Sequence, residues 1–363
     1  MGHTVSLYDK LMEAAAVHTL VSLKVFDQLP EDISRTIALD QLSEACAIDP
    51  ELLRRLLRLP ARRGVVQMQS NGNIGHTTIS LGYRTGCASA HLLQTVCDEA
   101  MRTALELPAW LRVADHRRGP QGTETNTDNV FTFRDGSDGE SMFSIMSRDP
   151  ERASNFHRGL DALHGVFPHT GFFNLEHIVE RPLSSDRLGS DCVTDQKLLV
   201  DVGGGSGTFL AKILEDHPGL SPTRVVLQDL PHVIDVARRN PQVPPGMCLQ
   251  AHDFFTAQPV RNARAYHLRL CLHNHSDELC TQILQHLVDA METPSKILIS
   301  ENIMPETLDV GVAGPLDMTM LLCGGTVRTL RQFDALFSRV GLAVKKVHKL
   351  AESTWAMMEV GTC

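Results

Sequence analysis

The segment that most constrains the fold is a short apolar run that ends in an acid and a cluster of glycines. Residues 197–201 read Lys-Leu-Leu-Val-Asp, and Val-Gly-Gly-Gly-Ser-Gly follows through Gly207. Such a run predicts a buried strand, and glycines let the next turn approach a ligand closely. Helical spacing resumes with Phe209 and Ile213. A strand, a tight turn and a helix in this order indicate an α/β protein with its site at the carboxyl end of a sheet.

The rest of the C-terminal half repeats this alternation. Apolar runs at 224–228, 265–272 and 296–300 predict further buried strands. Helical periodicity occupies 233–238 and the segment that Ser276 caps. Strands that alternate with helices predict a Rossmann-like, doubly wound and mostly parallel sheet covered on both faces.

The N-terminal part has a different pattern. Asp49 before Pro50 predicts a helix cap, and Pro60 is expected to help stop that helix. Residues 64–68 and 77–79 are expected to pair as strands across a polar turn. Helices followed by a hairpin are typical of a winged helix, and a long helix is expected near 88–111. The remaining expectations are helices at 149–165 and 172–180, loops at 117–140 and 181–196, and two domains, 1–115 and 116–363.

Composition narrows the classes of partner. A formal net charge of -9 over 363 residues disfavours a phosphate backbone as ligand. The nine cysteines include no CxxC pair, so no metal site is expected, and they suit reduced thiols in a cytoplasmic protein. No apolar run is long enough for a membrane span. Residues 1–6 match the loose myristoylation pattern, but no polybasic run follows, so an ordinary start is favoured.

The glycine spacing favours a nucleoside ligand without a pyrophosphate. The dinucleotide fingerprint requires a sixth-position glycine, where this chain has Thr208 or Leu210, and no Walker loop ending is present. Asp229 follows the second strand, where a carboxylate can accept from ribose hydroxyls. Asp253 and Phe254 follow the next turn, where an acid can accept from an adenine amine and a ring can pack on the base.

Three motifs resemble those of class I O-methyltransferases, the small-molecule enzymes of plant phenolics and fungal polyketides. They are Leu-Val-Asp-Val-Gly-Gly-Gly-Ser-Gly at 199–207, Asp-Leu-Pro-His-Val-Ile at 229–234 and Leu-His-Asn-His-Ser-Asp-Glu at 272–278. The resemblance covers nearly the whole chain. It implies S-adenosylmethionine as cofactor, a small-molecule substrate and an N-terminal winged-helix domain that forms a homodimer.

The resemblance also implies roles for individual residues. Asp201 opens the cofactor loop, and Gly203 and Gly205 line the methionine part of the cofactor. The remaining cofactor residues are Asp229 with Leu230 at the ribose, Asp253 and Phe254 at the adenine, and Arg269 nearby. His273 falls on the general base and Glu301 on one of two acids that orient it. A histidine titrates in the range that suits removal of a phenol or enol proton.

Several positions depart from the family pattern. Asn274 replaces the acid after the base, His275 replaces a tryptophan, and Val327 replaces the second orienting acid. Leu160 stands where a methionine near the acceptor is usual. A second interpretation comes from fungal relatives of this family that keep the cofactor but catalyse pericyclic or dehydrative cyclisations. The absence of the second orienting acid at Val327 fits this interpretation. Retention of His273 and Glu301 fits methyl transfer.

Other side chains are candidates with ordinary alternatives. Phe156, His164 and Met320 are candidates to border the acceptor, and core packing is their alternative role. Five arginines at and after the third helix raise a third hypothesis, a DNA-binding regulator. The acidic net charge favours a solvated face instead. Those arginines are Arg54, Arg55, Arg58, Arg62 and Arg63.

Overall fold

The computed structural model describes residues 2–113, 127–136, 139–165, 167, 173, 175, 196–307, 310–351 and 353–363. The chain forms two compact units that interleave in sequence. One comprises Met1–Leu105 and Phe143–Val166, and the other comprises Glu106–Met142 and Phe167–Cys363. The division into domains 1–115 and 116–363 stays a prediction.

The first unit is mainly helical. Its core contains Leu20, Phe26, Leu42, Leu53 and Ile74, each fully buried. The elements are α1 (Gly2–Ser22), η1 (Val25–Gln28), α2 (Leu39–Cys46), α3 (Pro50–Arg62), β1 (Val66–Met68), β2 (Ile74–His76), α4 (Thr78–Leu81), α5 (Ala88–Thr95), η2 (Val96–Met101), α8 (Met142–Ser147) and α9 (Pro150–His164). The helix α6 (Arg102–Trp110) begins in this unit.

The second strand of the hairpin, β2, lies three residues earlier in the chain than predicted. β1 pairs antiparallel with β2, which ends at His76. Thr77 instead caps α4 through a capping box with Ser80, so its hydroxyl serves a helix. Pro60 also lies inside α3, which continues to Arg62. Pro60 has no amide hydrogen to donate to the carbonyl four residues earlier, yet the helix continues for one more half-turn.

The expected long helix contains a π-helical segment. η2 separates α5 from α6, and α9 packs along α5. The two backbones approach closely at Gly159, where an added Cβ would lie 2.0 Å from the Thr95 hydroxyl oxygen. The carboxylate of Glu99 in η2 receives two hydrogen bonds of 2.7 Å from Arg152 on α9. This buried pairing fixes the register of the two helices.

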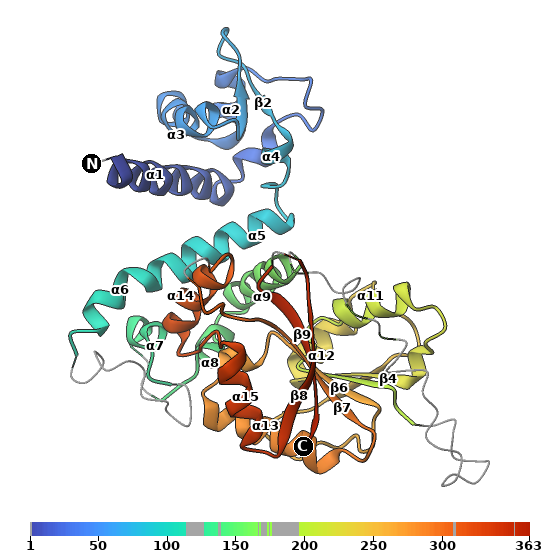
Figure 1. Ribbon diagram of the computed structural model, residues 1–363. Coiled ribbons are helices and arrows are strands. Elements are labelled where there is room, and N and C mark those ends of the chain that lie inside the picture. The colour runs from blue at the N-terminus through green and yellow to red at the C-terminus, as the bar shows by residue number, and fades with distance from the viewer. Residues whose placement is uncertain are drawn as a thin grey trace. The chain divides into compact units, whose positions relative to one another are not determined.

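The second unit contains a seven-stranded sheet among the described residues, in the order β5-β4-β3-β6-β7-β9-β8 (Figure 1). The first five strands in this order are parallel, and β9 runs antiparallel to both neighbours. The strands are β3 (Leu199–Val202), β4 (Val225–Asp229), β5 (Cys248–Ala251), β6 (Ala265–Arg269), β7 (Lys296–Asn302), β8 (Leu342–Lys349) and β9 (Trp355–Thr362). The predicted doubly wound, mostly parallel sheet is confirmed.

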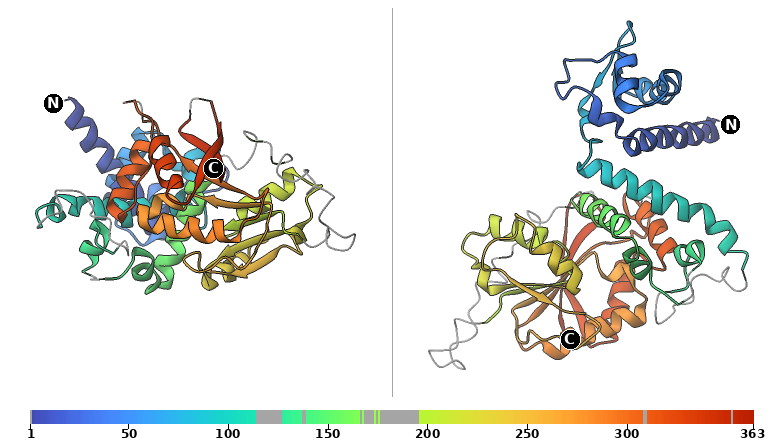
Figure 2. Two further views of the ribbon diagram at one scale, coloured as in Figure 1. Left: turned by 60° about the horizontal axis from the view of Figure 1, so that its bottom comes forward. Right: turned by 180° about the vertical axis from the view of Figure 1, so that it is seen from behind.

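Helices cover both faces of this sheet, which Figure 2 shows from two further directions. α13 (Asp277–Ala290) and α15 (Leu330–Ser338) pack with the face that carries Val200, Tyr266 and Ile299. α11 (Thr208–Asp216) and α12 (Pro231–Ala237) pack with the opposite face. Their buried leucine and isoleucine side chains supply the apolar burial that stabilises each layer.

Some elements of this unit were not predicted. α7 (Val130–Asp135) lies where a loop was expected, because Asn129 and Thr132 form a capping box. α14 (Ala313–Cys323), β5, β8 and β9 also had no counterpart among the predictions. The expected helix at 172–180 and the expected loop at 181–196 fall almost entirely outside the described residues.

Candidate functional site

The glycine loop joins β3 to α11 through three left-handed residues. Gly203, Gly205 and Gly207 have φ values of 71°, 62° and 81°, a region that side chains disfavour. A Cβ built at Gly205 would meet nothing within 4 Å, so space is open above the loop. One built at Gly203 would lie 3.0 Å from the Cys271 sulfur. The loop is therefore shaped for close approach of a ligand at Gly205.

Asp229 ties this loop to the neighbouring strand β4. Its Oδ2 accepts from the Gly205 amide at 2.9 Å, and its Oδ1 accepts from the Leu230 amide at 2.7 Å. Burial raises the pKa of the Asp229 carboxyl, and these two backbone bonds oppose the rise. A carboxylate has about four acceptor positions. The two that remain fit the pair of ribose hydroxyls predicted for Asp229.

Asp253 and Phe254 lie in the turn that follows β5. The Asp253 carboxylate is exposed and accepts from the Phe255 amide at 3.0 Å, which is a turn-stabilising bond. The Phe254 ring lies beside Gly203 and packs edge-on against Phe255 and His275, with centroid distances of 4.9 and 5.6 Å. An aromatic wall thus stands next to the glycine loop. Its contact with an adenine stays a prediction.

The side chain of Asp201 does not face the open space above the loop. It is 1% exposed, and its Oδ1 is 2.9 Å from Nδ1 of His267. The assignment of Asp201 to the cofactor site stays a prediction. Arg269, at the end of β6, has its guanidinium 5.1 Å from the Trp355 ring centroid. Burial lowers the pKa of Arg269 to about 10.

His273 and Glu301 are brought together as the sequence predicted. His273 lies in the short 3₁₀ helix η5 (Leu272–Asn274), and Glu301 lies on β7. The His273 Nδ1–H donates to Glu301 Oε2 at 2.7 Å, and the Glu301 side chain is 1% exposed. The hydrogen bond that the His273 ring makes with the described residues is at Nδ1, and none is found there at Nε2. A carboxylate on Nδ1 fixes the tautomer that leaves Nε2 as an acceptor.

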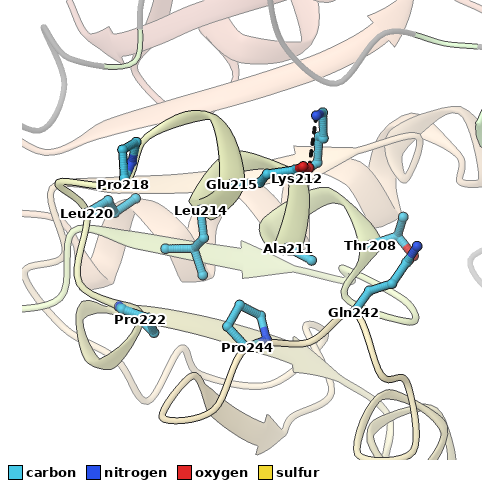
Figure 3. Close-up of a pocket in the computed structure, with 10 residues that line it drawn as sticks. All are labelled: Thr208, Ala211, Lys212, Leu214, Glu215, Pro218, Leu220, Pro222, Gln242 and Pro244. Atoms are coloured by element: carbon cyan, nitrogen blue, oxygen red, sulfur yellow. Dashed lines mark hydrogen bonds and ion pairs between the residues drawn. The ribbon is translucent and has the colours of Figure 1, made fainter.

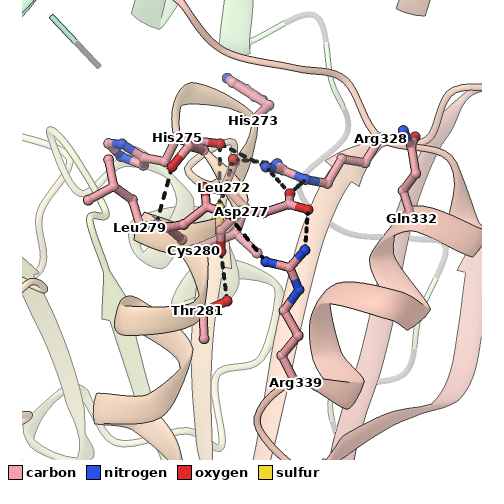
Figure 4. Close-up of polar contacts among 12 residues, drawn as sticks. Leu272, His273, His275, Asp277, Leu279, Cys280, Thr281, Arg328, Gln332 and Arg339 are labelled. Atoms are coloured by element: carbon pink, nitrogen blue, oxygen red, sulfur yellow. Dashed lines mark hydrogen bonds and ion pairs between the residues drawn. The ribbon is translucent and has the colours of Figure 1, made fainter. Parts of the chain in front are cut away.

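The turn that carries His273 is held by Arg328, which the sequence reasoning missed (Figure 4). Arg328 donates to the carbonyls of Leu272 and His275, both at 2.8 Å, and to the Asp277 carboxylate at 2.9 Å. Its side chain is 3% exposed. The sequence signal that could have identified Arg328 is the run Gly-Gly-Thr-Val-Arg-Thr at 324–329, which served only to align Val327 with the family's second acid.

The segment that carries Arg328 also closes on His273 through its backbone. The Thr326 amide donates to the His273 carbonyl at 2.8 Å. A Cβ at Gly325 would lie 2.2 Å from the same carbonyl oxygen, so only glycine fits there. Figure 4 shows the His273 ring pointing away from the Arg328–Asp277 cluster. The backbone of His273 is thus held by this turn, and its ring points away from the cluster.

Asn274, Met320 and Val327 have packing roles in the described structure. The Asn274 amide donates to the Leu270 carbonyl at 3.2 Å. Val327 and Met320 are buried together with Ala313. The Val327 amide donates to Asp317 at 3.1 Å. An apolar cluster therefore occupies the position of the expected second acid, and Glu301 is the one carboxylate that contacts His273 in the described part.

The predicted acceptor residues on α9 belong to the first unit. Phe156 is buried and packs edge-on against Phe143 at 6.4 Å. Leu160 is partly buried, and the His164 side chain lies outside the described residues. Their part in the site stays a prediction.

A groove of about 620 Å³ beside α11 lies elsewhere in the second unit (Figure 3). The described residues around it include none of the predicted site residues. Its charged groups, Lys212 and Glu215, pair with each other at 2.9 Å. The groove is lined by Thr208, Ala211, Lys212, Leu214, Glu215, Pro218, Leu220, Pro222, Gln242 and Pro244.

The described residues hold no cluster of three or more histidine, cysteine or acidic side chains that could bind a metal ion. No helix in this part of the chain is long and apolar enough to cross a membrane. On α3, Arg54 and Arg58 contact Glu51 at 2.6 and 3.3 Å, and just after this helix Arg63 contacts Glu13 at 3.6 Å. These ion pairs favour the solvated face over the DNA-binding hypothesis.

Comparison with known proteins decides the family. A model of the O-methyltransferase domain matches residues 183–343. The O-methyltransferase kntB of Aspergillus niger is 31% identical over 354 residues, which are 97% of this chain and 81% of that protein. The chain belongs to the O-methyltransferase family. Its cofactor is S-adenosylmethionine, and the open glycine loop with its neighbouring carboxylate fits that cofactor.

Solved structures at lower identity share the fold. The complex of LepI with SAM has a TM-score of 0.85 at 24% identity and covers 100% of this O-methyltransferase chain and 89% of its own. A protein described as a pericyclic reaction enzyme has a TM-score of 0.85 at 24% identity, over 99% and 89% of the two chains. The same fold is therefore found with a second kind of chemistry.

Proposed function

We propose that this protein transfers the methyl group of S-adenosylmethionine to an oxygen of a small aromatic or polyketide-type metabolite, with His273 as general base. The observation that carries the proposal is the 2.7 Å contact of His273 Nδ1 with Glu301, together with an Nε2 that meets no described partner. A ring held in this way can accept the proton of a phenol or enol.

The cofactor would occupy the space above the glycine loop. Gly203 and Gly205 would line its methionine part, Asp229 with Leu230 its ribose, and Asp253 with Phe254 its adenine. The bound sulfonium supplies an activated methyl group, so the chain has to align the acceptor oxygen and remove its proton. Arg269 lies on the same sheet edge, near the charges of Asp201 and Glu301.

Glu301 would orient the base and stabilise the imidazolium that forms on proton transfer. Arg328 would keep the His273 turn in place, because three of its bonds end on residues 272–277. The residues proposed to border the acceptor are Phe156, Leu160, His164, Asn274, Met320 and Val327.

A second function is favoured by one observation. Val327 lies in an apolar cluster where a second orienting acid was expected. A weakened base would suit a cyclase in which the bound sulfonium acts as a fixed positive charge and no methyl group leaves it.

Incubation with methyl-labelled cofactor and a panel of phenols, enols and pyridones separates the two functions. Label on the acceptor oxygen supports methyl transfer. An isomerised or dehydrated acceptor without label supports the cyclase. Neither product, combined with no binding of S-adenosylhomocysteine, would reject both.

We also propose that the protein forms a homodimer through α1, which belongs to the proposed winged-helix domain. Val5, Tyr8 and Met12 are 59%, 63% and 42% exposed on this helix. Exposed apolar side chains at helical spacing indicate an interface. Light scattering after chromatography should give twice the mass of the chain, and Tyr8→Asp combined with Met12→Asp should give the monomer mass.

A further inference from the structure

Three polar side chains form a buried row across the sheet. Asp201 on β3, His267 on β6 and Ser300 on β7 are each 1–2% exposed. His267 Nδ1 lies 2.9 Å from Asp201 Oδ1, and His267 Nε2 lies 2.9 Å from Ser300 Oγ. The Phe209 ring covers the imidazole, with centroids 4.3 Å apart. Ser300 is 2% exposed, so no substrate can reach its hydroxyl and the row is not a nucleophilic triad.

The bonds define which proton each atom carries. An ionised carboxylate can only accept, so Nδ1 of His267 donates to Asp201. In the uncharged ring Nε2 is then an acceptor, and the Ser300 hydroxyl donates to it. Both ring nitrogens are satisfied, and the ring plane is fixed from two strands.

The Asp201 carboxylate lies directly beneath the glycine loop. A Cβ built at Gly204 would lie 2.3 Å from Asp201 Oδ2, so the oxygen is in close contact with the loop backbone. Oδ2 is buried and has no hydrogen-bond partner in the described part of the chain. Among the described residues, the donor that orients this carboxylate is therefore His267.

We propose that His267 is a positioning residue for the cofactor loop. It acts by orienting Asp201. The Asp201 carboxylate packs against Gly204 and so determines the position of the loop backbone that contacts the cofactor. This inference rests on the proposed function of the loop. It adds a requirement that neither the loop nor His273 implies, namely a donor at the Nδ1 position of residue 267.

Amide substitutions separate the two bonds of His267. In His267→Asn the amide nitrogen stands close to the place of Nδ1 and can still donate to Asp201, whereas in His267→Gln it stands closer to Nε2 and reaches Ser300. We measure the Kd of S-adenosylhomocysteine by titration calorimetry. We expect His267→Gln and His267→Phe to weaken binding at least about tenfold, as for loss of a bond to a charged group, and His267→Asn to stay within about threefold of wild type.

A matched control is available on the same sheet. His348 Nε2 contacts Glu359 Oε1 at 2.7 Å on β8 and β9, away from the loop. His348→Phe should leave the Kd unchanged, with thermal unfolding measured for every variant. Equal weakening by Asn and Gln, or an unchanged Kd in His267→Phe, would overturn the proposal. Failure of the wild-type protein to bind would instead reject the proposed function of the loop.

Discussion

Among the described residues, His267 and His273 each form an almost fully buried pair with a carboxylate, and the two pairs differ at the second ring nitrogen. His267 meets Asp201 at 2.9 Å and His273 meets Glu301 at 2.7 Å, each through Nδ1. The second ring nitrogen of His267 is taken by Ser300, whereas that of His273 has no described partner. The same pairing thus serves two purposes. A ring bonded at both nitrogens transmits position, and a ring bonded at one can accept a proton.

The largest expected effect tests this difference directly. His273→Gln should lower kcat about a thousandfold, because a general base contributes roughly 10²–10⁴ in rate. The Kd of S-adenosylhomocysteine should stay unchanged, since the loop is untouched. Steady-state kinetics and calorimetry measure the two. A loss of binding equal to the loss of rate would show that the two histidines have the same role.

A substitution of Arg328 tests whether the position of the His273 ring depends on the turn formed by residues 272–277. Arg328→Ala removes three bonds and leaves the buried Leu272 carbonyl without this donor, so we expect a loss of about 3 kcal/mol in the free energy of unfolding. Denaturant unfolding measures it. Arg339 is the matched control, since it contacts the same Asp277 at 3.2 Å but is 45% exposed. Arg339→Ala should cost less than about 0.5 kcal/mol, and equal losses would contradict the assigned role.

Glu301→Gln sharpens the comparison at the carboxylate. The amide keeps the size of the side chain but removes the charge that stabilises an imidazolium. We expect kcat to fall by about a hundredfold with little change in cofactor affinity. Rapid-quench kinetics that isolate the methyl-transfer step provide the measurement. An unaffected step would show that the charge of Glu301 does not assist His273 in methyl transfer.

The smallest effect is expected at His275, whose ring contacts no carboxylate among the described residues. Burial lowers the pKa of His275 to about 4, and its Nδ1 has no partner in the described part. The unfolded chain binds this proton near pH 6.5 and the folded chain only near pH 4. Stability is therefore lost as pH falls through that window. Relative to His275→Phe, the wild type should lose about 2 kcal/mol more between pH 8 and pH 5 in urea unfolding. Equal losses would contradict the burial.

The sequence predicted the parts of the site that depend on local order. A strand, four glycines and a helix predict a loop such as 203–207, and a serine before a run with helical periodicity predicts the cap of α13. The pairing of His267 with Asp201 depends on the register between β3 and β6, which no local pattern contains. The role of Arg328 was not predicted for the same reason, because Arg328 lies 53 residues from His275, whose carbonyl it binds.

Two errors in the fold have local causes. Threonine is common in strands, but the Thr77 hydroxyl forms a capping box with Ser80 at the start of α4. The polar run around residue 129 resembles a loop, yet Asn129 begins a helix by the same device. Strands β8 and β9 were missed because the last antiparallel pair lies outside the strand–helix alternation on which the prediction relied.

In the proposed reaction, Nε2 of His273 receives the proton of the acceptor. A crystal structure of the protein with S-adenosylhomocysteine and a methyl acceptor tests this role. The acceptor oxygen should lie about 2.6–3.2 Å from His273 Nε2 and on the loop side of that ring. An acceptor bound elsewhere, or an Nε2 bonded to another group of the chain, would contradict the claim.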